Sequence, residues 1–307
     1  MKATTHTEVY RRYSGTPRHA RLRCAPLVAS GLRVAFKGRW GLLLYLPPLI
    51  ALVVFGFIVY AKFSLEQGVT PGALTGERAS AGVAMVGNMA SQLLEVRDIS
   101  FGFIIGMSTF SVLIAGWYGA GLIAEDRRAG AHLLYFARPI SKLDYALGKL
   151  GVVATMTSLG MFVPSLLLCL IATLTAPGWT FLEEHGWMFA QVVLYSFVHM
   201  LVLGSIVLAI SSIASKRTYA LAGVAAFFMA QAGVATLLAV LMHDRTWFLL
   251  APIANLRRVA AHIFGVKRAI GVPLDWSPWW SWLVLAGTCV LAWAIVALRL
   301  RRMEAVA

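Results

Sequence analysis

Residues 125–149 read EDRRAGAHLLYFARPISKLDYALGK and form the most polar internal stretch between two long apolar runs. Gly130 offers a stop for the helix before it, because glycine adopts a left-handed backbone without steric cost. Pro139 ends the short apolar segment that follows, since proline disfavours helical geometry in the residue before it. Ser141, with Asp144 three residues later, resembles a capping box that begins the next helix. The stretch therefore predicts two long helices joined by a short cross-helix and a sharp corner.

The composition is that of an integral membrane protein. Of the 307 residues, 59% are hydrophobic and only 13% are charged, whereas soluble domains average roughly 45–50% apolar and about 25% charged residues. The three cysteines, Cys24, Cys169 and Cys289, are far apart and form neither a CxxC pair nor a Cys/His cluster. We therefore predict buried, inert thiols and neither a metal site nor a disulfide.

Apolar runs long enough to cross a bilayer recur along the chain, since a spanning helix needs about 20 mostly apolar residues. Pro47 and Pro48 are expected to bend the first span, and Pro164 to interrupt the third. The six predicted spans are residues 41–62, 99–124, 147–175, 187–213, 219–242 and 282–298. The predicted fold class is an all-α polytopic membrane protein.

The sequence divides into three regions. Residues 1–25 are polar and basic without apolar periodicity, which indicates a disordered tail. Residues 26–40 carry apolar side chains near helical spacing together with Arg33 and Lys37, which predicts an amphipathic helix in the membrane interface. Residues 41–307 hold the six spans and form the transmembrane domain.

Two long inserts, residues 63–98 and 243–280, separate neighbouring spans. In the second insert, Pro252 suits the first turn of a helix, and an apolar stripe lies opposite Arg257 and Arg258. The stripe consists of Ile253, Leu256, Val259, Ala260 and Ile263. We predict a helix over residues 253–264 that lies flat over the bundle.

The distribution of charge predicts the topology. Six spans put both ends of the chain on one side, and that side carries 19 of the 27 Lys and Arg residues. The positive-inside rule makes it the cytoplasmic side, so the inserts at 63–98 and 243–280 are expected to face outward. The net charge of +14 is thus a signal of topology, and it does not imply a nucleic-acid partner.

The sequence lacks the motifs of nucleotide hydrolysis and of metalloproteases. The Gly148–Lys149 pair is not part of a P-loop, because Leu143 stands where the first glycine of that loop would be. The Glu-Glu-His sequence at 183–185 suits a solvated turn better than a metal site.

Two polar side chains stand out within the predicted spans, His199 in the fourth and Gln231 in the fifth. Buried polar groups at membrane depth are candidates for a substrate path. Hydrogen bonding between helices is the alternative, and it is the one that we favour.

The 125–149 stretch resembles the cytoplasmic loop of ABC type-2 (ABC-2) exporter permeases. In that family an acidic residue closes the second span. It is followed by a glycine, a short Leu-rich helix, an Arg/Ser-Pro-Val/Ile-Ser-Arg/Lys sequence, an aromatic residue and Gly-Lys. The matching residues here are Glu125, Gly130, Leu133, Leu134, Arg138, Pro139, Ile140, Ser141, Lys142, Tyr145, Gly148 and Lys149. The family often has Thr and Arg where this chain has Ala131 and Lys142.

The resemblance implies the permease subunit of an ATP-driven exporter, a multi-pass protein of the bacterial cytoplasmic membrane with both termini cytoplasmic. Its implied partners are two copies of a separate ABC ATPase subunit and a second copy of this permease or a homologous one. The chain itself would be no enzyme and would need no cofactor. A secondary transporter, or a membrane anchor or assembly factor without transport, remains as an alternative.

The resemblance also implies which residues couple the chain to the ATPase. Residues 132–138 would form the coupling helix that inserts into a groove on the ATPase. The expected coupling residues are Glu125, Gly130, His132, Leu133, Leu134, Tyr135, Phe136, Arg138 and Pro139.

Overall fold

The computed structural model describes residues 24–66, 95–131, 140–266 and 275–304. Every regular element in these ranges is a helix, which confirms the predicted all-α class. Six stretches of the described residues are long and apolar enough to cross a membrane: Trp40–Ser64, Val96–Arg128, Lys142–Thr175, Trp187–Ile213, Arg217–Leu241 and Pro278–Arg302. The fourth has the bounds predicted from the sequence, and the others agree within five residues at each end.

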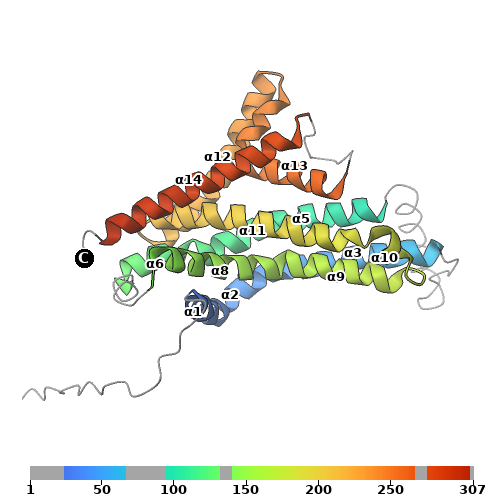
Figure 1. Cartoon of the computed structure of the whole chain (residues 1–307), viewed down its shortest axis with the longest axis horizontal. Coiled ribbons are helices and arrows are strands. Elements are labelled where there is room, and N and C mark those ends of the chain that lie inside the picture. Colours follow the sequence, from blue (N-terminus) through green and yellow to red (C-terminus); the bar gives the residue numbers. More distant parts are fainter. Residues whose placement is uncertain (1–23, 67–94, 132–139, 267–274, 305–307) are drawn as a thin grey trace, which may run out of the picture.

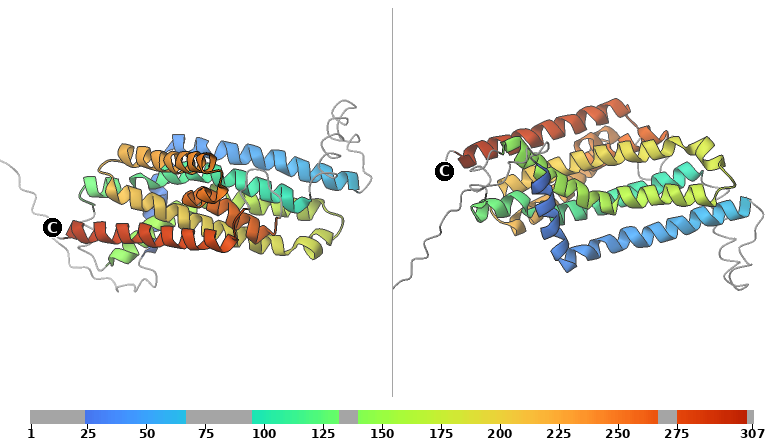
Figure 2. Two further views of the ribbon diagram at one scale, coloured as in Figure 1. Left: turned by 90° about the horizontal axis from the view of Figure 1, so that it is seen from above. Right: turned by 60° about the horizontal axis from the view of Figure 1, so that its bottom comes forward.

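The N-terminal part of the described chain turns sharply before it enters the bundle. Its elements are α1 (Ala25–Lys37), α2 (Arg39–Leu42), the 3-10 turn η1 (Leu43–Tyr45) and α3 (Leu46–Glu66). Figure 2 shows α1, in dark blue, lying across the long helices. Pro47 and Pro48 fall in the first turn of α3, where a missing N–H removes no helical hydrogen bond. The irregular turn therefore precedes the prolines.

The second and third spans are each divided in two. Their elements are α5 (Val96–Gly119), α6 (Gly121–Arg128), α8 (Lys142–Gly160) and α9 (Phe162–Thr175). The third span breaks at Met161, whose φ and ψ are −128° and −58°, three residues before Pro164. A proline clashes with the carbonyl four residues earlier and cannot donate to it. The break predicted at Pro164 therefore lies one turn upstream.

The rest of the chain adds two long helices and three short ones to a central span. The elements are α10 (Thr180–His185), α11 (Trp187–Ile213), α12 (Arg217–Leu241), η3 (Arg245–Leu250), α13 (Pro252–Phe264) and α14 (Pro278–Glu304). The expected helix over 253–264 is thus present as α13. It packs against α14, α11 and α5.

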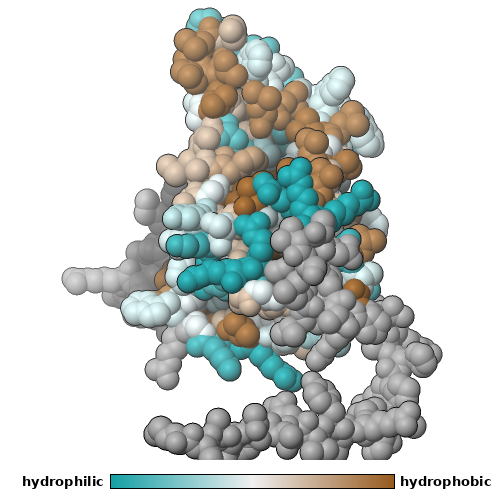
Figure 3. All heavy atoms as spheres, turned by 90° about the vertical axis from the view of Figure 1, so that its left-hand side faces the viewer, coloured by the Kyte–Doolittle hydropathy of each residue, from teal (hydrophilic) through white to brown (hydrophobic). Residues whose placement is uncertain are grey.

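The long helices run between two ends that we name for what they hold. The corner end carries α1, α6, the start of α8 and the last turns of α14, and the far end carries α10 and the start of α5 (Figure 1). Viewed from the corner end, hydrophilic side chains gather in the middle and hydrophobic ones above, toward α12 (Figure 3). Exposed basic residues at this end are Arg33, Lys37, Arg128, Lys216, Arg217, Arg301 and Arg302.

Burial separates central helices from peripheral ones. The most apolar windows of the α5–α6 span and of α11 are each 61% buried, whereas that of α12 is 11% buried. Figure 1 shows α12 inclined away from the long axis of the bundle. The structure is therefore organised around α5 and α11, while α12 offers most of its apolar surface to lipid or to another chain.

Candidate functional site

The corner begins with a helix stop and ends with a helix start, as the sequence predicts. Gly130 has φ +66° and follows the last residues of α6. At the start of α8, the Ser141 hydroxyl accepts a hydrogen bond from the Asp144 backbone N–H at 3.0 Å, and the Asp144 carboxylate accepts one from the Ser141 N–H at 3.2 Å. This reciprocal pair confirms the capping box and fixes where the chain re-enters the bundle.

Of the nine expected coupling residues, Glu125 and Gly130 lie in the described part of the chain. The other seven lie outside the described residues: His132, Leu133, Leu134, Tyr135, Phe136, Arg138 and Pro139. Their role as a coupling segment stays a prediction. The structure does describe how the two ends of this segment are held.

An ion pair joins α6 to α8. Lys149 Nζ lies 2.6 Å from Asp126 Oδ2, and the Tyr145 hydroxyl donates to the same oxygen at 2.8 Å. Tyr145 and Lys149 are one helical turn apart on α8, and the two residues are nearly buried, at 1% and 8% exposure. The aromatic residue and the Gly-Lys pair of the sequence pattern thus converge on one carboxylate.

Arg127 joins α6 to α11. Its guanidinium donates to the backbone carbonyls of Ser212, Ile213 and Ala214, at 3.0, 3.2 and 2.5 Å. The last carbonyls of a helix lack partners within the helix, and a cation there is favoured by the helix dipole. Adjacent residues of α6 therefore bind two different spans.

Two glycines of α8 let α1 lie directly on the helix. A Cβ added at Gly148 would come within 2.8 Å of Leu27 Cβ, and one at Gly151 within 2.8 Å of Val28 Cγ2. Real Cβ atoms do not approach so closely, so any larger residue here would displace α1. The glycine of the Gly-Lys pair thus positions α1 beside the corner.

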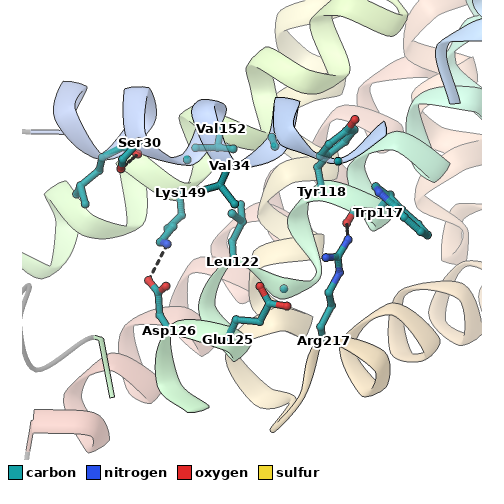
Figure 4. A pocket seen from close by; sticks show the side chains of 15 residues that line it. Ser30, Val34, Trp117, Tyr118, Leu122, Glu125, Asp126, Lys149, Val152 and Arg217 are labelled. Atoms are coloured by element: carbon teal, nitrogen blue, oxygen red, sulfur yellow. Dashed lines mark hydrogen bonds and ion pairs between the residues drawn. The ribbon is translucent and has the colours of Figure 1, made fainter. Parts of the chain in front are cut away.

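A cavity of about 260 Å³ lies between α1 and the corner. Four charged side chains line it: Glu125, Asp126, Lys149 and Arg217. Figure 4 shows the Lys149–Asp126 pair on one side, Arg217 on the other and Glu125 between them. Arg217 donates to the backbone carbonyl of Trp117 at 3.1 Å. Within the described ranges, Glu125 is paired with no cation.

His199 joins the two central helices. The residue is fully buried, and its Nε2 lies 2.6 Å from the Ser111 hydroxyl oxygen. Ser111 also bonds to the Ser108 carbonyl at 2.7 Å, and since that carbonyl can only accept, Ser111 must donate to it. His199 therefore donates from Nε2 when both contacts form. This is the helix–helix hydrogen bond that the sequence favours.

Gln231 is placed differently. Both heteroatoms of its side-chain amide are buried, and neither has a hydrogen-bond partner among the described residues. No hydrogen bond between Gln231 and His199 is present in this part of the chain. That His199 or Gln231 lines a substrate path stays a prediction.

With the corner in view, comparison with known proteins is decisive for the family. A family model described as ABC-2 family transporter protein matches residues 32–305. The chain belongs to this family. No curated protein matches it.

Membership of the ABC-2 family assigns the chain to the permease component of an ABC transporter. Such a permease is a non-catalytic, multi-pass membrane subunit that works with an ABC ATPase. The match covers all six candidate spans, so it applies to the whole bundle.

Asp126 and Arg127 of this ABC-2 permease were missed by the reasoning from sequence. The polar run after the second span places them at the corner, but the partners of Asp126 lie 19 and 23 residues away and those of Arg127 at least 85 residues away. The one available signal is the spacing of Tyr145 and Lys149, which places both on one face of α8. That signal does not identify the carboxylate that they share.

Proposed function

We propose that the chain is the transmembrane subunit of an ATP-driven exporter in the bacterial cytoplasmic membrane. Two copies of a separate ATPase subunit would dock on residues 132–138, and a second copy of this chain, or a homologous permease, would complete the pore. Both termini would lie in the cytoplasm, on the corner end.

One observation carries this proposal: the corner is tied to three spans at once. Asp126 is bound to Lys149 and Tyr145 of α8, and Arg127 to the end of α11. A displacement of residues 132–138 by an ATPase would therefore reach α5, α8 and α11 through short polar contacts. A bare linker between two helices would have no such ties.

The charge distribution supports the orientation. The corner end gathers the exposed basic residues described above, and cytoplasmic loops carry an excess of Lys and Arg. The export direction is supported by the resemblance of the 125–149 stretch to the loop of exporter permeases. In the described chain, the acidic residues of the spans lie near the span ends, which favours an ATP-driven permease over a proton-coupled carrier with an acidic relay in its spans.

The coupling role is tested with Leu134→Asp in the complex with the partner ATPase. A charge buried in an apolar groove costs on the order of 3–5 kcal/mol, so co-purification with the ATPase should fall strongly while membrane insertion is retained. The matched control is Leu182→Asp, which places the same charge on exposed α10 at the far end. Binding and ATP turnover unchanged in Leu134→Asp would remove this segment from the interface.

The energy source is tested in the same preparation. Purified chain alone should not hydrolyse ATP, and turnover should appear only when the ATPase is added. Transport by the chain alone, driven by a proton or sodium gradient in liposomes, would instead show a secondary transporter.

The orientation is tested by labelling single cysteines in a cysteine-free background. A membrane-impermeant thiol reagent added outside the cell should modify Glu183→Cys, at the far end, and spare Arg128→Cys, at the corner. The reverse pattern would invert the topology.

A further inference from the structure

Arg257 is partly buried and reaches toward α5, although the sequence places it on the polar face of a surface helix. The opposite side of α13 is buried, with Leu256, Val259 and Ala260 at most 1% exposed. At the end of α13, Phe264 contacts the Phe101 ring of α5, with ring centroids 6.1 Å apart. Arg257, two turns earlier, reaches Thr109 of α5. The helix thus dips from the far end toward the middle of the membrane.

The depth of this arginine follows from its neighbour on α5. Thr109 lies 13 residues after Val96, the first residue of the span, or about 20 Å along the helix at 1.5 Å per residue. It is therefore near the middle of the Val96–Arg128 stretch. A charged side chain at such depth is costly, and such residues mark substrate or ion pathways by default.

Arg257 is only weakly bonded, in contrast to the next residue. Its Nη2 lies 3.5 Å from the Thr109 hydroxyl, its Nε is buried without a partner, and no carboxylate of the described chain lies within ion-pair distance. Arg258 instead donates from Nε and Nη2 to the Trp276 carbonyl, at 3.1 and 2.9 Å. Arg258 therefore connects α13 to the residues just before α14, whereas Arg257 retains unused hydrogen-bond donors.

A buried hydroxyl lies on α11, which packs against both α13 and α5. Tyr195 is fully buried, and its hydroxyl has no partner in hydrogen-bond geometry among the described residues. The Ser108 side chain of α5 and the Arg257 guanidinium of α13 both lie near this hydroxyl. The Ser108 hydroxyl itself donates to the Ile105 carbonyl at 2.7 Å. A guanidinium from α13 and the hydroxyls of Tyr195 and Ser108 from α11 and α5 thus lie near one another, and no carboxylate of the described chain pairs with the guanidinium.

Among the described residues, nothing covers the face of α5 next to this cluster. Gly102, Gly106 and Thr109 follow one another at helical spacing, and a Cβ added at either glycine would meet no described atom within 4 Å. Thr109 is exposed and Leu113, one turn further, is 58% exposed. An apolar chain can lie along this face while a polar group at its end reaches the arginine.

We propose that Arg257, together with the Tyr195 and Thr109 hydroxyls, binds the anionic group of an amphiphilic cargo whose apolar part lies along the open face of α5. The anionic group is inferred from Arg257, because a cation at this depth that pairs with no carboxylate of the described chain is stabilised by an anion. The open apolar face of α5 favours an amphiphile over a small soluble ion. The identification as cargo rests on the proposed transport function, whereas the binding site does not.

The site is tested with the purified permease in phosphatidylcholine nanodiscs, without any ATPase. The probes are phosphatidylglycerol and phosphatidylcholine that carry a photoreactive diazirine in the acyl chain, and mass spectrometry reads cross-links to residues 102–113. We expect the anionic probe to label this segment in preference to the choline probe. Removal of a charge-assisted hydrogen bond should lower this preference about tenfold in Arg257→Gln.

Three variants make the test specific. Arg257→Lys should keep part of the preference, Tyr195→Phe should lower it without loss of thermal stability, and Arg245→Gln, at an exposed arginine outside the spans, should leave it unchanged. Equal labelling by both probes, or an unchanged preference in Arg257→Gln, would overturn the site. Competition by inorganic phosphate at millimolar concentration would assign the cluster to a soluble anion and overturn the amphiphile.

These outcomes are separate from those of the transport function. A complex that couples to its ATPase but shows no preference in this assay would refute the anion site and leave the permease assignment intact. A preference for the anionic probe without ATPase coupling would support the anion site and refute the proposed ATP-driven export.

Discussion

The carboxylate of Asp126 and the ammonium group of Lys149 lie 2.6 Å apart at the point where the corner meets the bundle. The two side chains are only 17% and 11% exposed, so the pair is largely shielded from water. With the Tyr145 hydroxyl on the same carboxylate, it forms a small polar network that fixes α6 against α8. The behaviour of this network can be predicted from the energetics of buried ion pairs.

Asp126→Leu should destabilise the protein by about 3–5 kcal/mol, because it removes the carboxylate that is paired with the largely buried Lys149 charge. The double variant Asp126→Leu with Lys149→Met should recover most of this loss, since apolar replacement of a whole buried pair is often neutral. Unfolding by denaturant in detergent measures both. A double variant no more stable than Asp126→Leu would show that the pair contributes in some other way.

Gly130 should tolerate asparagine far better than valine. Its φ of +66° lies in the left-handed region, which costs an ordinary residue roughly 1–2 kcal/mol, whereas asparagine enters it with little strain. A Cβ at this position would meet no atom of the described residues within 4 Å, so we attribute the effect to the backbone. Unfolding midpoints of Gly130→Asn and Gly130→Val compare the two, and equal midpoints would contradict a positive φ.

Gly148→Leu should displace α1 from α8, because its Cβ would lie 2.8 Å from Leu27 Cβ. Spin labels at the exposed positions Val34 and Leu147 report the distance between the two helices. The control is Gly287→Leu, on α14, where an added Cβ meets nothing within 4 Å. We expect the distance to change in the first variant and not in the second; an unchanged distance in both would show that α1 does not pack here.

The hydrogen bond between Ser111 and His199 should contribute a coupling free energy of roughly 0.5–1.5 kcal/mol to stability. A double-mutant cycle of Ser111→Ala and His199→Phe measures this term, since each single variant removes the same contact at 2.6 Å. A coupling near zero would leave His199 free for another role at membrane depth.

Local chemistry decided what could be predicted at the corner. The Gly130 stop and the Ser141–Asp144 capping box depend on neighbouring residues of the chain, so the sequence specifies them without reference to the rest of the fold. The break near Pro164 follows from the same local sterics, although it lies at Met161 because the clash falls on the preceding turn.

The tertiary structure alone decided which distant groups meet. An apolar stripe predicts α13 as a helix, but the same stripe can lie on a membrane surface or against other helices. Only its packing on α11 and α14 carries Arg257 to the level of Thr109.

The six spans, the all-α fold class and the local form of the corner are therefore specified by the amino-acid sequence. Apolar run length fixes the spans, because a bilayer demands about 20 apolar residues wherever they occur. The contacts of Asp126 and of Arg127 were decided by the tertiary structure, because they depend on how whole helices pack. Helix packing is a sum over many small side-chain contacts, and no single stretch of sequence specifies it.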